Sequence, residues 1–231
     1  MTVAAVSHRV GRVIHDADAH IAEPIGWLDR YASEYVKANL QPGVRPSDLE
    51  ELQPFIKAAE KRLAGGDPGK TAELKADVFA KDSKLNPWSS FGSVDKKERS
   101  EMLDLTGIQQ QLLFSSPLAM TRFAFSKDEK LLEGGCEALN RGMADFCSDD
   151  PRLMPVGFVS MFDPALAYEI AKKAIELGIK ALWVPSDAVG GRAPSHIDFD
   201  PVWALAEEAG VPIVLHIGSG RLMGPAYKNT G

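Results

Sequence analysis

Two helical segments in the second half of the chain begin and end with the same residue types. The segment DPALAYEIAKKAIELG has Asp163 as a predicted N-cap, Pro164 at the first helical position and Gly178 at its end. The segment DPVWALAEEAG repeats this order from Asp200 to Gly210. A short β-rich run precedes and follows each segment. Helices and strands that alternate in this way predict βαβ units.

Further β-rich runs lie earlier in the chain, and another helix is predicted from about Asp128 to Ser148. Because alternating strands and helices form parallel sheets, we predict an α/β fold with a parallel sheet. The predicted strands are RVIHDAD (12–18), QQQLLFSS (109–116), MPVGFVSM (154–161), KALWVPS (180–186) and VPIVLHIG (211–218).

The stretch from Glu23 to Asp104 joins the first two predicted strands and is far longer than a usual βα loop. It contains an amphipathic segment at about 27–40, charged helical patterns and turn-rich sequences. We therefore expect one domain over residues 1–231 with a helical insertion at about 24–105. Insertions of this kind often cover a site, and a surface elaboration without a functional part remains the alternative.

The composition of the chain argues against some classes of partner and indicates a cellular compartment. The chain has 231 residues, a net charge of −6 and a pI near 5.4, which argues against a nucleic-acid binder. No apolar run approaches the roughly 20 residues of a membrane span, and the N-terminal sequence has no secretory pattern. Cys136 and Cys147 lack a Cys-x-x-Cys spacing. We expect reduced core thiols in a cytoplasmic protein, without a nucleic-acid or membrane partner.

The first predicted strand carries polar residues where a buried parallel strand should be apolar. By alternation, Asp16, Asp18 and His20 are expected to share one face with Ile14, whereas His15 points the other way and is assigned a structural role. Asp18 and His20 lie nearest the carboxyl end, where parallel α/β enzymes place their chemistry. They can chelate one divalent ion. Asp16 is expected to support them or to contact a neighbouring strand.

The last predicted strand, VPIVLHIGSG, ends in His216. Carboxyl ends of parallel strands meet at one rim, so His216 is expected near Asp18 and His20. Taken singly, each feature has a structural alternative: a hydrogen-bonded Asp–His pair at a strand end, and a core histidine that has its own hydrogen-bond partners. The combination favours a metal site.

Several segments together resemble the amidohydrolase superfamily, specifically its amidohydrolase-2 branch. The resemblance runs in order along nearly the whole chain and is weakest in the insertion. It is carried by DADAHIAEP, LDLTGIQQQLLF, ALNRGMADFCSDDPRLMPVGFVSMFDPALA and FDPVWALAEEAGVPIVLHIGSG. It implies a (β/α)₈ TIM-barrel type of fold, with a metal at the C-terminal rim and only about the first five βα units present. The branch includes aminocarboxymuconate-semialdehyde and γ-resorcylate-type decarboxylases, hydrolases and a lactonase.

The resemblance also implies a ligand set. The pair on the family's first strand is matched by Asp18 and His20, and the histidine on its fifth strand by His216. Binuclear relatives carry a lysine at the end of the fourth strand, but Lys180 lies at the opposite end here, so one divalent ion is implied. Zinc is the expected ion and manganese the alternative. The family's catalytic aspartate lies on an eighth strand, and no residue of this chain matches it.

The implied activity is hydrolysis or non-oxidative decarboxylation of a small carboxylated substrate, aromatic or muconate-like. Arg221 and Trp88 are the predicted substrate-binding residues. Arg221 and Arg122 are both candidates to bind a substrate carboxylate, and the alternative for each is an ordinary surface arginine. Phe91 is expected in a pocket or a local core, and His196 in a solvated loop.

Three hypotheses about function stay open: a mononuclear metal enzyme, an incomplete fragment or assembly partner of the same family, and a small α/β binding domain. A homo-oligomer is the candidate assembly of the enzyme. A truncated product, or completion by another chain, would account for a count of five strands.

Overall fold

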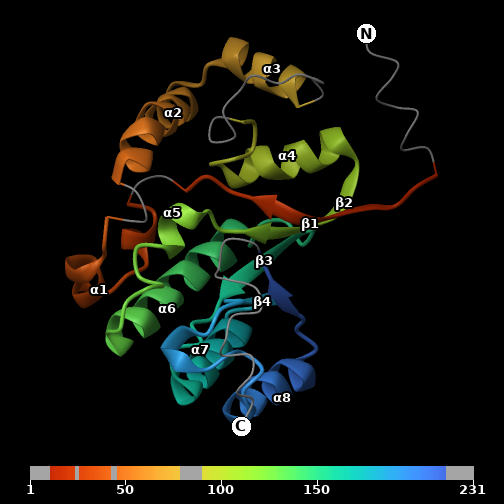
Figure 1. Cartoon of the computed structure of the whole chain (residues 1–231). Coiled ribbons are helices and arrows are strands. Elements are labelled where there is room, and N and C mark those ends of the chain that lie inside the picture. The colour runs from red at the N-terminus through yellow and green to blue at the C-terminus, as the bar shows by residue number, and fades with distance from the viewer. Residues whose placement is uncertain (1–10, 24–25, 43–45, 79–89, 217–231) are drawn as a thin grey trace.

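The computed structural model describes residues 11–23, 26–42, 46–78 and 90–216. Its centre is a parallel sheet of five strands in the order β1-β2-β3-β4-β5, which is also their order along the chain (Figure 1). The strands are β1 (Ile14–His20), β2 (Ile108–Phe114), β3 (Leu153–Phe158), β4 (Ala181–Val184) and β5 (Ile213–Leu215). All five predicted strands are thus confirmed, with their bounds shifted by a few residues.

Helices connect the strands as parallel pairing requires. Figure 1 shows α4 beside β1 and β2, and α6, α7 and α8 along the outer side of the curled sheet. The helical elements are η1 (Leu28–Arg30), α1 (Glu34–Asn39), α2 (Pro46–Gly65), α3 (Pro68–Asp77), α4 (Lys96–Thr106), α5 (Pro117–Met120), α6 (Glu129–Phe146), α7 (Pro164–Glu176), η3 (Val189–Gly191), η4 (Ile197–Phe199) and α8 (Asp200–Ala209). The arrangement is that of a curled half-barrel.

Side-chain caps begin the helices where the sequence predicts them, with one exception. The Asp163 carboxylate accepts hydrogen bonds from the amides of Ala165 and Leu166, at 2.9 and 3.0 Å, and so caps α7. The prediction that Asp200 caps α8 is wrong. The turn η4 runs directly into α8, so Asp200 already has helical backbone angles and Phe199 occupies the cap position.

Both cysteines lie in the core, as the sequence predicts. Cys136 and Cys147 are free and buried, and burial raises the pKa of each thiol to about 12. The thiols are therefore unreactive at neutral pH. Among the helices of the described segments, none is long and apolar enough to cross a membrane.

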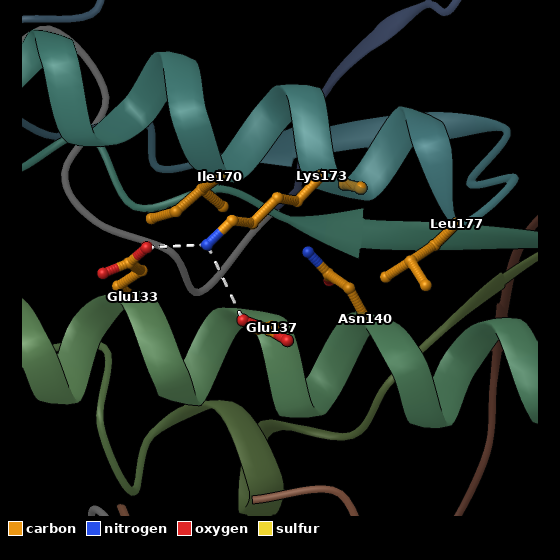
Figure 2. Close-up of a pocket in the computed structure, with 7 residues that line it drawn as sticks. Glu133, Glu137, Asn140, Ile170, Lys173 and Leu177 are labelled. Atoms are coloured by element: carbon orange, nitrogen blue, oxygen red, sulfur yellow. Dashed lines mark hydrogen bonds and ion pairs between the residues drawn. The ribbon is translucent and has the colours of Figure 1, made fainter. Parts of the chain in front are cut away.

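Charged side chains join helices α6 and α7 across their interface, and a buried amide joins α6 to β3 (Figure 2). Lys173 lies 2.7 Å from a carboxylate oxygen of Glu133 and 3.8 Å from one of Glu137. Deeper in the interface, the buried Asn140 amide donates to the carbonyl of Phe158 and accepts from its backbone N–H, at 3.1 and 2.8 Å. This side chain therefore attaches α6 to the last residue of β3.

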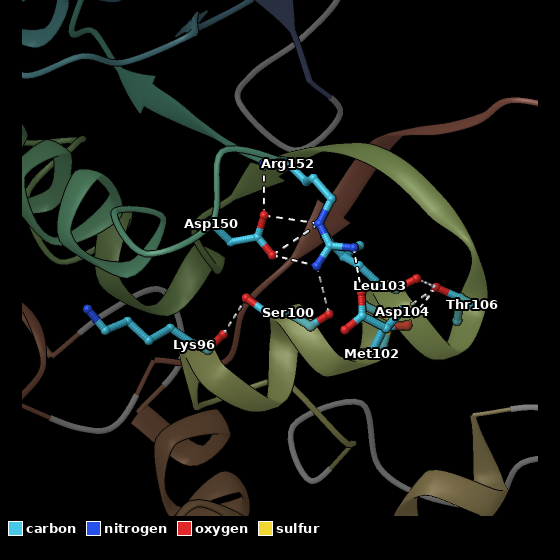
Figure 3. A network of polar contacts seen from close by, with 8 residues as sticks. All are labelled: Lys96, Ser100, Met102, Leu103, Asp104, Thr106, Asp150 and Arg152. Carbon is cyan, nitrogen blue, oxygen red and sulfur yellow. Dashed lines mark hydrogen bonds and ion pairs between the residues drawn. The ribbon is translucent and has the colours of Figure 1, made fainter.

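An arginine fixes α4 at the amino-terminal edge of the sheet (Figure 3). Arg152, just before β3, donates to Asp150 at 2.7 Å, to Asp104 at 2.6 Å and to the carbonyl of Ser100 at 3.3 Å. Hydrogen bonding to this guanidinium lowers the pKa of Asp150 to about 2. The ion pairs hold α4 against the start of β3, at the edge opposite the carboxyl ends of the strands.

The connections that follow β1 and β2 are joined by a buried carboxyl group. Glu23 is 4% exposed, and its carboxylate accepts a hydrogen bond of 2.6 Å from the amide of Ser116 and another from the Ser116 hydroxyl. Burial outweighs these hydrogen bonds and raises the pKa of Glu23 to about 7. Ionisation of Glu23 near neutral pH therefore works against folding.

Gly142 sets how closely the segment around η1 packs on α6. A Cβ at this position would lie 2.4 Å from the Trp27 ring, whereas a Cβ at Gly65, near the end of α2, would meet nothing within 4 Å. We expect Gly142→Ala to lower the free energy of unfolding by roughly 1–3 kcal/mol through overpacking. Gly65→Ala should raise it by roughly 0.4–1 kcal/mol, because alanine lowers the conformational entropy of the unfolded chain and its methyl group meets no neighbour here. Urea titrations of both variants check this pair, and equal effects would contradict it.

Glu23→Gln should change how stability depends on pH. Because the folded-state pKa of Glu23 is raised from 4.5 to about 7, its contribution to stability is complete below pH 4.5 and is lost as pH rises through 7. The shift corresponds to about 3 kcal/mol. The free energy of unfolding of Glu23→Gln, relative to that of the parent, should therefore increase between pH 4.5 and 8. Urea titrations in a chelator measure this, with the exposed Glu208→Gln as the control for loss of one carboxylate. Parallel curves for the parent and Glu23→Gln would refute it.

Candidate metal centre

An extra residue in β1 decides which side chains reach the rim. Asp16 pairs with Gln111 of β2 and Ala19 with Leu113, so β1 uses one residue more than β2 over this interval. Gln111 and Leu113 are 1% and 0% exposed, and Gln111 accepts a hydrogen bond of 3.4 Å from Arg99 of α4, so this side of β2 faces the helices. Asp16 and Ala19 therefore face the helices. The prediction that Asp16 shares a face with Asp18 is wrong, because the bulge breaks the alternation.

The bulge turns Asp18 and His20 to the other side, toward the carboxyl end of β5. His216 Nε2 lies 2.9 Å from Asp18 Oδ1 and 3.2 Å from His20 Nε2, and His20 Nε2 lies 3.4 Å from Asp18 Oδ1. These three residues offer ligand atoms that all lie within 4.8 Å of one another. The structure thus brings together the three predicted metal ligands, although His216 is far from the other two in the sequence.

The orientation of His20 suits metal binding. Its Nδ1 lies 3.2 Å from the carbonyl oxygen of Ser115, an atom that only accepts hydrogen bonds. Nδ1 must therefore carry the proton in the neutral ring, which leaves the Nε2 lone pair directed at Asp18 and His216. Ser115 precedes Ser116, which Glu23 holds, so the buried carboxyl group also fixes the carbonyl that orients His20.

Aromatic rings support the two imidazoles. The Phe114 ring centroid lies 5.5 Å from that of His20 and 4.8 Å from that of His216, and Trp183 lies 5.3 Å from His216. Phe114 and Trp183 are 1% and 2% exposed. Sequence reasoning missed both as part of the site. Their positions at the carboxyl ends of β2 and β4 are the signal that could have indicated them.

The three converging side chains differ in their access to solvent. The exposed fraction is 70% for the side chain of Asp18, 37% for His20 and 15% for His216. Histidine nitrogens and a carboxylate oxygen form a donor set that suits zinc and other divalent transition metals. The arrangement can therefore hold one ion, with the two histidines on its more buried side. The side next to the exposed Asp18 carboxylate stays open to water or substrate.

The other predicted site residues do not join this cluster. Trp88 and Arg221 lie outside the described residues. Phe91 is 4% exposed and belongs to the core, with the Lys75 ammonium 5.2 Å from its ring centroid. Lys180 is exposed and precedes β4, at the end of the strand opposite the rim, as the sequence predicts.

Two further predicted residues have local structural roles. Arg122 Nε donates to the carbonyl of Gln41 at 3.2 Å, and a terminal nitrogen lies 3.9 Å from Asp29. The prediction of a solvated His196 is wrong. Its side chain is 14% exposed, and Nδ1 accepts a hydrogen bond of 3.2 Å from the amide of Asp198, which caps η4.

Solved structures share this fold at low sequence identity. An amidohydrolase from Mycobacterium avium subsp. paratuberculosis K-10 is 18% identical with a TM-score of 0.61, covering 90% of this chain and 58% of that chain. A 5-carboxyvanillate decarboxylase from Novosphingobium aromaticivorans, with bound manganese and 3-methoxy-4-hydroxy-5-nitrobenzoic acid, is 18% identical with a TM-score of 0.53, covering 95% and 53%. A 5-carboxyvanillate decarboxylase from Sphingomonas paucimobilis is 14% identical with a TM-score of 0.51, covering 88% and 51%.

The chain spans between 51% and 58% of the length of these three structures, and its half-barrel corresponds to part of a TIM barrel. The predicted fold class, with about five βα units, is thereby confirmed. No curated protein matches the chain. A family model described as Amidohydrolase matches residues 15–229. Because this match covers nearly the whole chain and extends from β1 to beyond β5, the chain belongs to the amidohydrolase family.

Proposed function

We propose that Asp18, His20 and His216 bind one divalent metal ion and that the chain belongs to a metal-dependent enzyme acting on a small carboxylated substrate. The observation that carries this proposal is the convergence of three ligand atoms from the carboxyl ends of β1 and β5. Zinc is the proposed ion and manganese the alternative, which gains support from the manganese in the Novosphingobium decarboxylase structure.

A bound divalent ion supplies Lewis acidity for a water molecule or a substrate oxygen. His20 and His216 would hold it through their Nε2 atoms, and Asp18 through a carboxylate oxygen. The Ser115 carbonyl keeps His20 in the required tautomer. Phe114 and Trp183 exclude water from behind the imidazoles, while the exposed side of Asp18 gives the substrate its approach.

The reaction is proposed as hydrolysis or non-oxidative decarboxylation, and the substrate as an aromatic or muconate-like carboxylate. Two solved structures of similar fold are 5-carboxyvanillate decarboxylases, which supports an aromatic carboxylate. Arg221 and Trp88 remain the proposed substrate-binding residues. We also propose a cytoplasmic homo-oligomer and one domain over residues 1–231 with a helical insertion at about 24–105.

A specific observation favours a second candidate function, that of a catalytically incomplete assembly partner. The outer side of β5 exposes Ile213 and Leu215, at 37% and 59%. These residues line an apolar groove of about 520 Å³ together with Trp203 and Val211 beside α8. In this alternative, further βα units cover the groove and supply the remaining catalytic groups.

Metal content tests the proposed site. We expect about one ion per chain after incubation with zinc or manganese and gel filtration, measured by elemental analysis. His216→Ala should lose the ion because it removes one of three ligands. His196→Ala, which removes an imidazole outside the cluster, should keep it. No bound ion in the parent, or equal content in His216→Ala, would refute the site.

Activity then separates the two candidate functions. The metal-loaded chain should release carbon dioxide from carboxylated phenols or hydrolyse small lactones, and His216→Ala should do neither. If the parent binds one ion but turns over neither class of substrate, the assembly-partner function is favoured.

A further inference from the structure

Arg99 is a buried cation behind the candidate metal ligands. It lies on α4 and is 6% exposed. One terminal nitrogen, Nη2, donates to the backbone carbonyl of His20, and the other, Nη1, donates to Gln111 Oε1 at 3.4 Å. Loss of hydration lowers the pKa of Arg99 to about 10, so the side chain still carries its charge at neutral pH.

Gln111 extends this contact to the second ligand of β1. Its side-chain nitrogen donates to Asp16 Oδ2 at 2.9 Å, and Asp16 Oδ1 accepts a hydrogen bond of 3.1 Å from the amide of Asp18. One guanidinium therefore holds the backbone of His20 directly and that of Asp18 through two intermediates. Both contacts lie at or beside the bulge that turns these ligands to the rim.

The contacts of Arg99 differ from those of an ordinary buried ion pair. The ion pair between α2 and α4 offers the comparison. Arg62 is 8% exposed and pairs directly with the carboxylate of Glu98, including a bond of 2.8 Å. Arg99 instead directs its terminal nitrogens to a carbonyl and an amide oxygen, and among the described residues its Nε has no hydrogen-bond partner. Burial of a charge without a directly paired carboxylate is costly. If packing were the only role of this position, an apolar residue would be more favourable there.

The backbone around Arg99 is fixed as closely as its side chain. Gly92 has a φ of +76°, and a Cβ there would lie 2.9 Å from Arg99 Cα. The next residue, Ser93, accepts a hydrogen bond of 2.8 Å from the amide of Ala22, two residues beyond His20. The segment 92–93 therefore seats the first turn of α4 against the chain that leaves β1.

We propose that Arg99 is a positioning residue that sets the spacing of Asp18 and His20 by holding the His20 carbonyl and, through Gln111, the Asp16 carboxylate. This inference rests on the proposed metal site and adds to it a determinant that lies outside the cluster. Its consequence is that Arg99 governs metal affinity and ligand geometry without touching the ion. Loss of such outer contacts weakens metal binding by about 10- to 100-fold.

Cobalt(II) titration of the full chain tests the proposal, since cobalt absorption bands report the number and geometry of ligands. Arg99→Met should bind cobalt about 10- to 100-fold more weakly than the parent, with shifted bands. Arg99→Lys should lose less, because an ammonium can still donate to the His20 carbonyl. Arg62→Met is the matched control, a buried arginine of the neighbouring ion pair, and it should keep the parental affinity and bands.

Parental affinity and bands in Arg99→Met, or equal losses in Arg99→Met and Arg62→Met, would overturn the proposal. If Arg99→Met shows no cooperative unfolding transition, Gln111→Met replaces it, because that variant breaks only the link to Asp16. A weaker affinity with shifted bands supports the proposal, and unchanged values overturn it. If the parent binds no cobalt, both the metal site and the inference are refuted. If the parent and the variants bind cobalt equally, the metal site stands and only the positioning role of Arg99 is refuted.

Discussion

The pairing of β1 with β2, with one extra residue in β1 between Asp16 and Ala19, is the constraint on which the rim depends. Without the bulge, Asp16 would share a face with Asp18 and His20, and a third polar group would occupy the rim. With it, Asp16 turns to the helix layer and meets Gln111, while Asp18 and His20 meet His216. A bulge beside a functional site redirects side chains in this way.

The two edges of the sheet have different roles. At the amino-terminal edge, Arg152 holds α4 against the start of β3, and this contact stabilises the packing of the helix. At the carboxyl edge, the contacts made by Glu23 and Ser115 orient His20. Helix α4 takes part at both edges, because Arg99 reaches His20 while Asp104 meets Arg152. Helix α4 therefore contacts both the amino-terminal edge of the sheet and the backbone of a candidate metal ligand.

Much of the fold was predictable because its signals are local. Alternating β-rich runs, and helices that begin at Asp163 and at Asp128, depend on neighbours within a few residues. The cap of α8 was not predictable in this way, since the preceding turn η4 shifts it by one residue. Four residues around the site carry no such local signal, because their contacts exist only once the strands and α4 are packed together. They are Phe114, Trp183, Arg99 and Gln111.

The sequence by itself determined the strand and helix order, the family and the three candidate ligands, because residue type and spacing along single elements carry that information. Only the tertiary structure decided which face Asp16 occupies, that Asp18 and His216 meet at 2.9 Å, and that a buried guanidinium lies behind them. The physical reason is register. A shift of one residue between β1 and β2 reverses which side chains face the rim, and pairing between residues 94 or 95 positions apart in the chain sets that register.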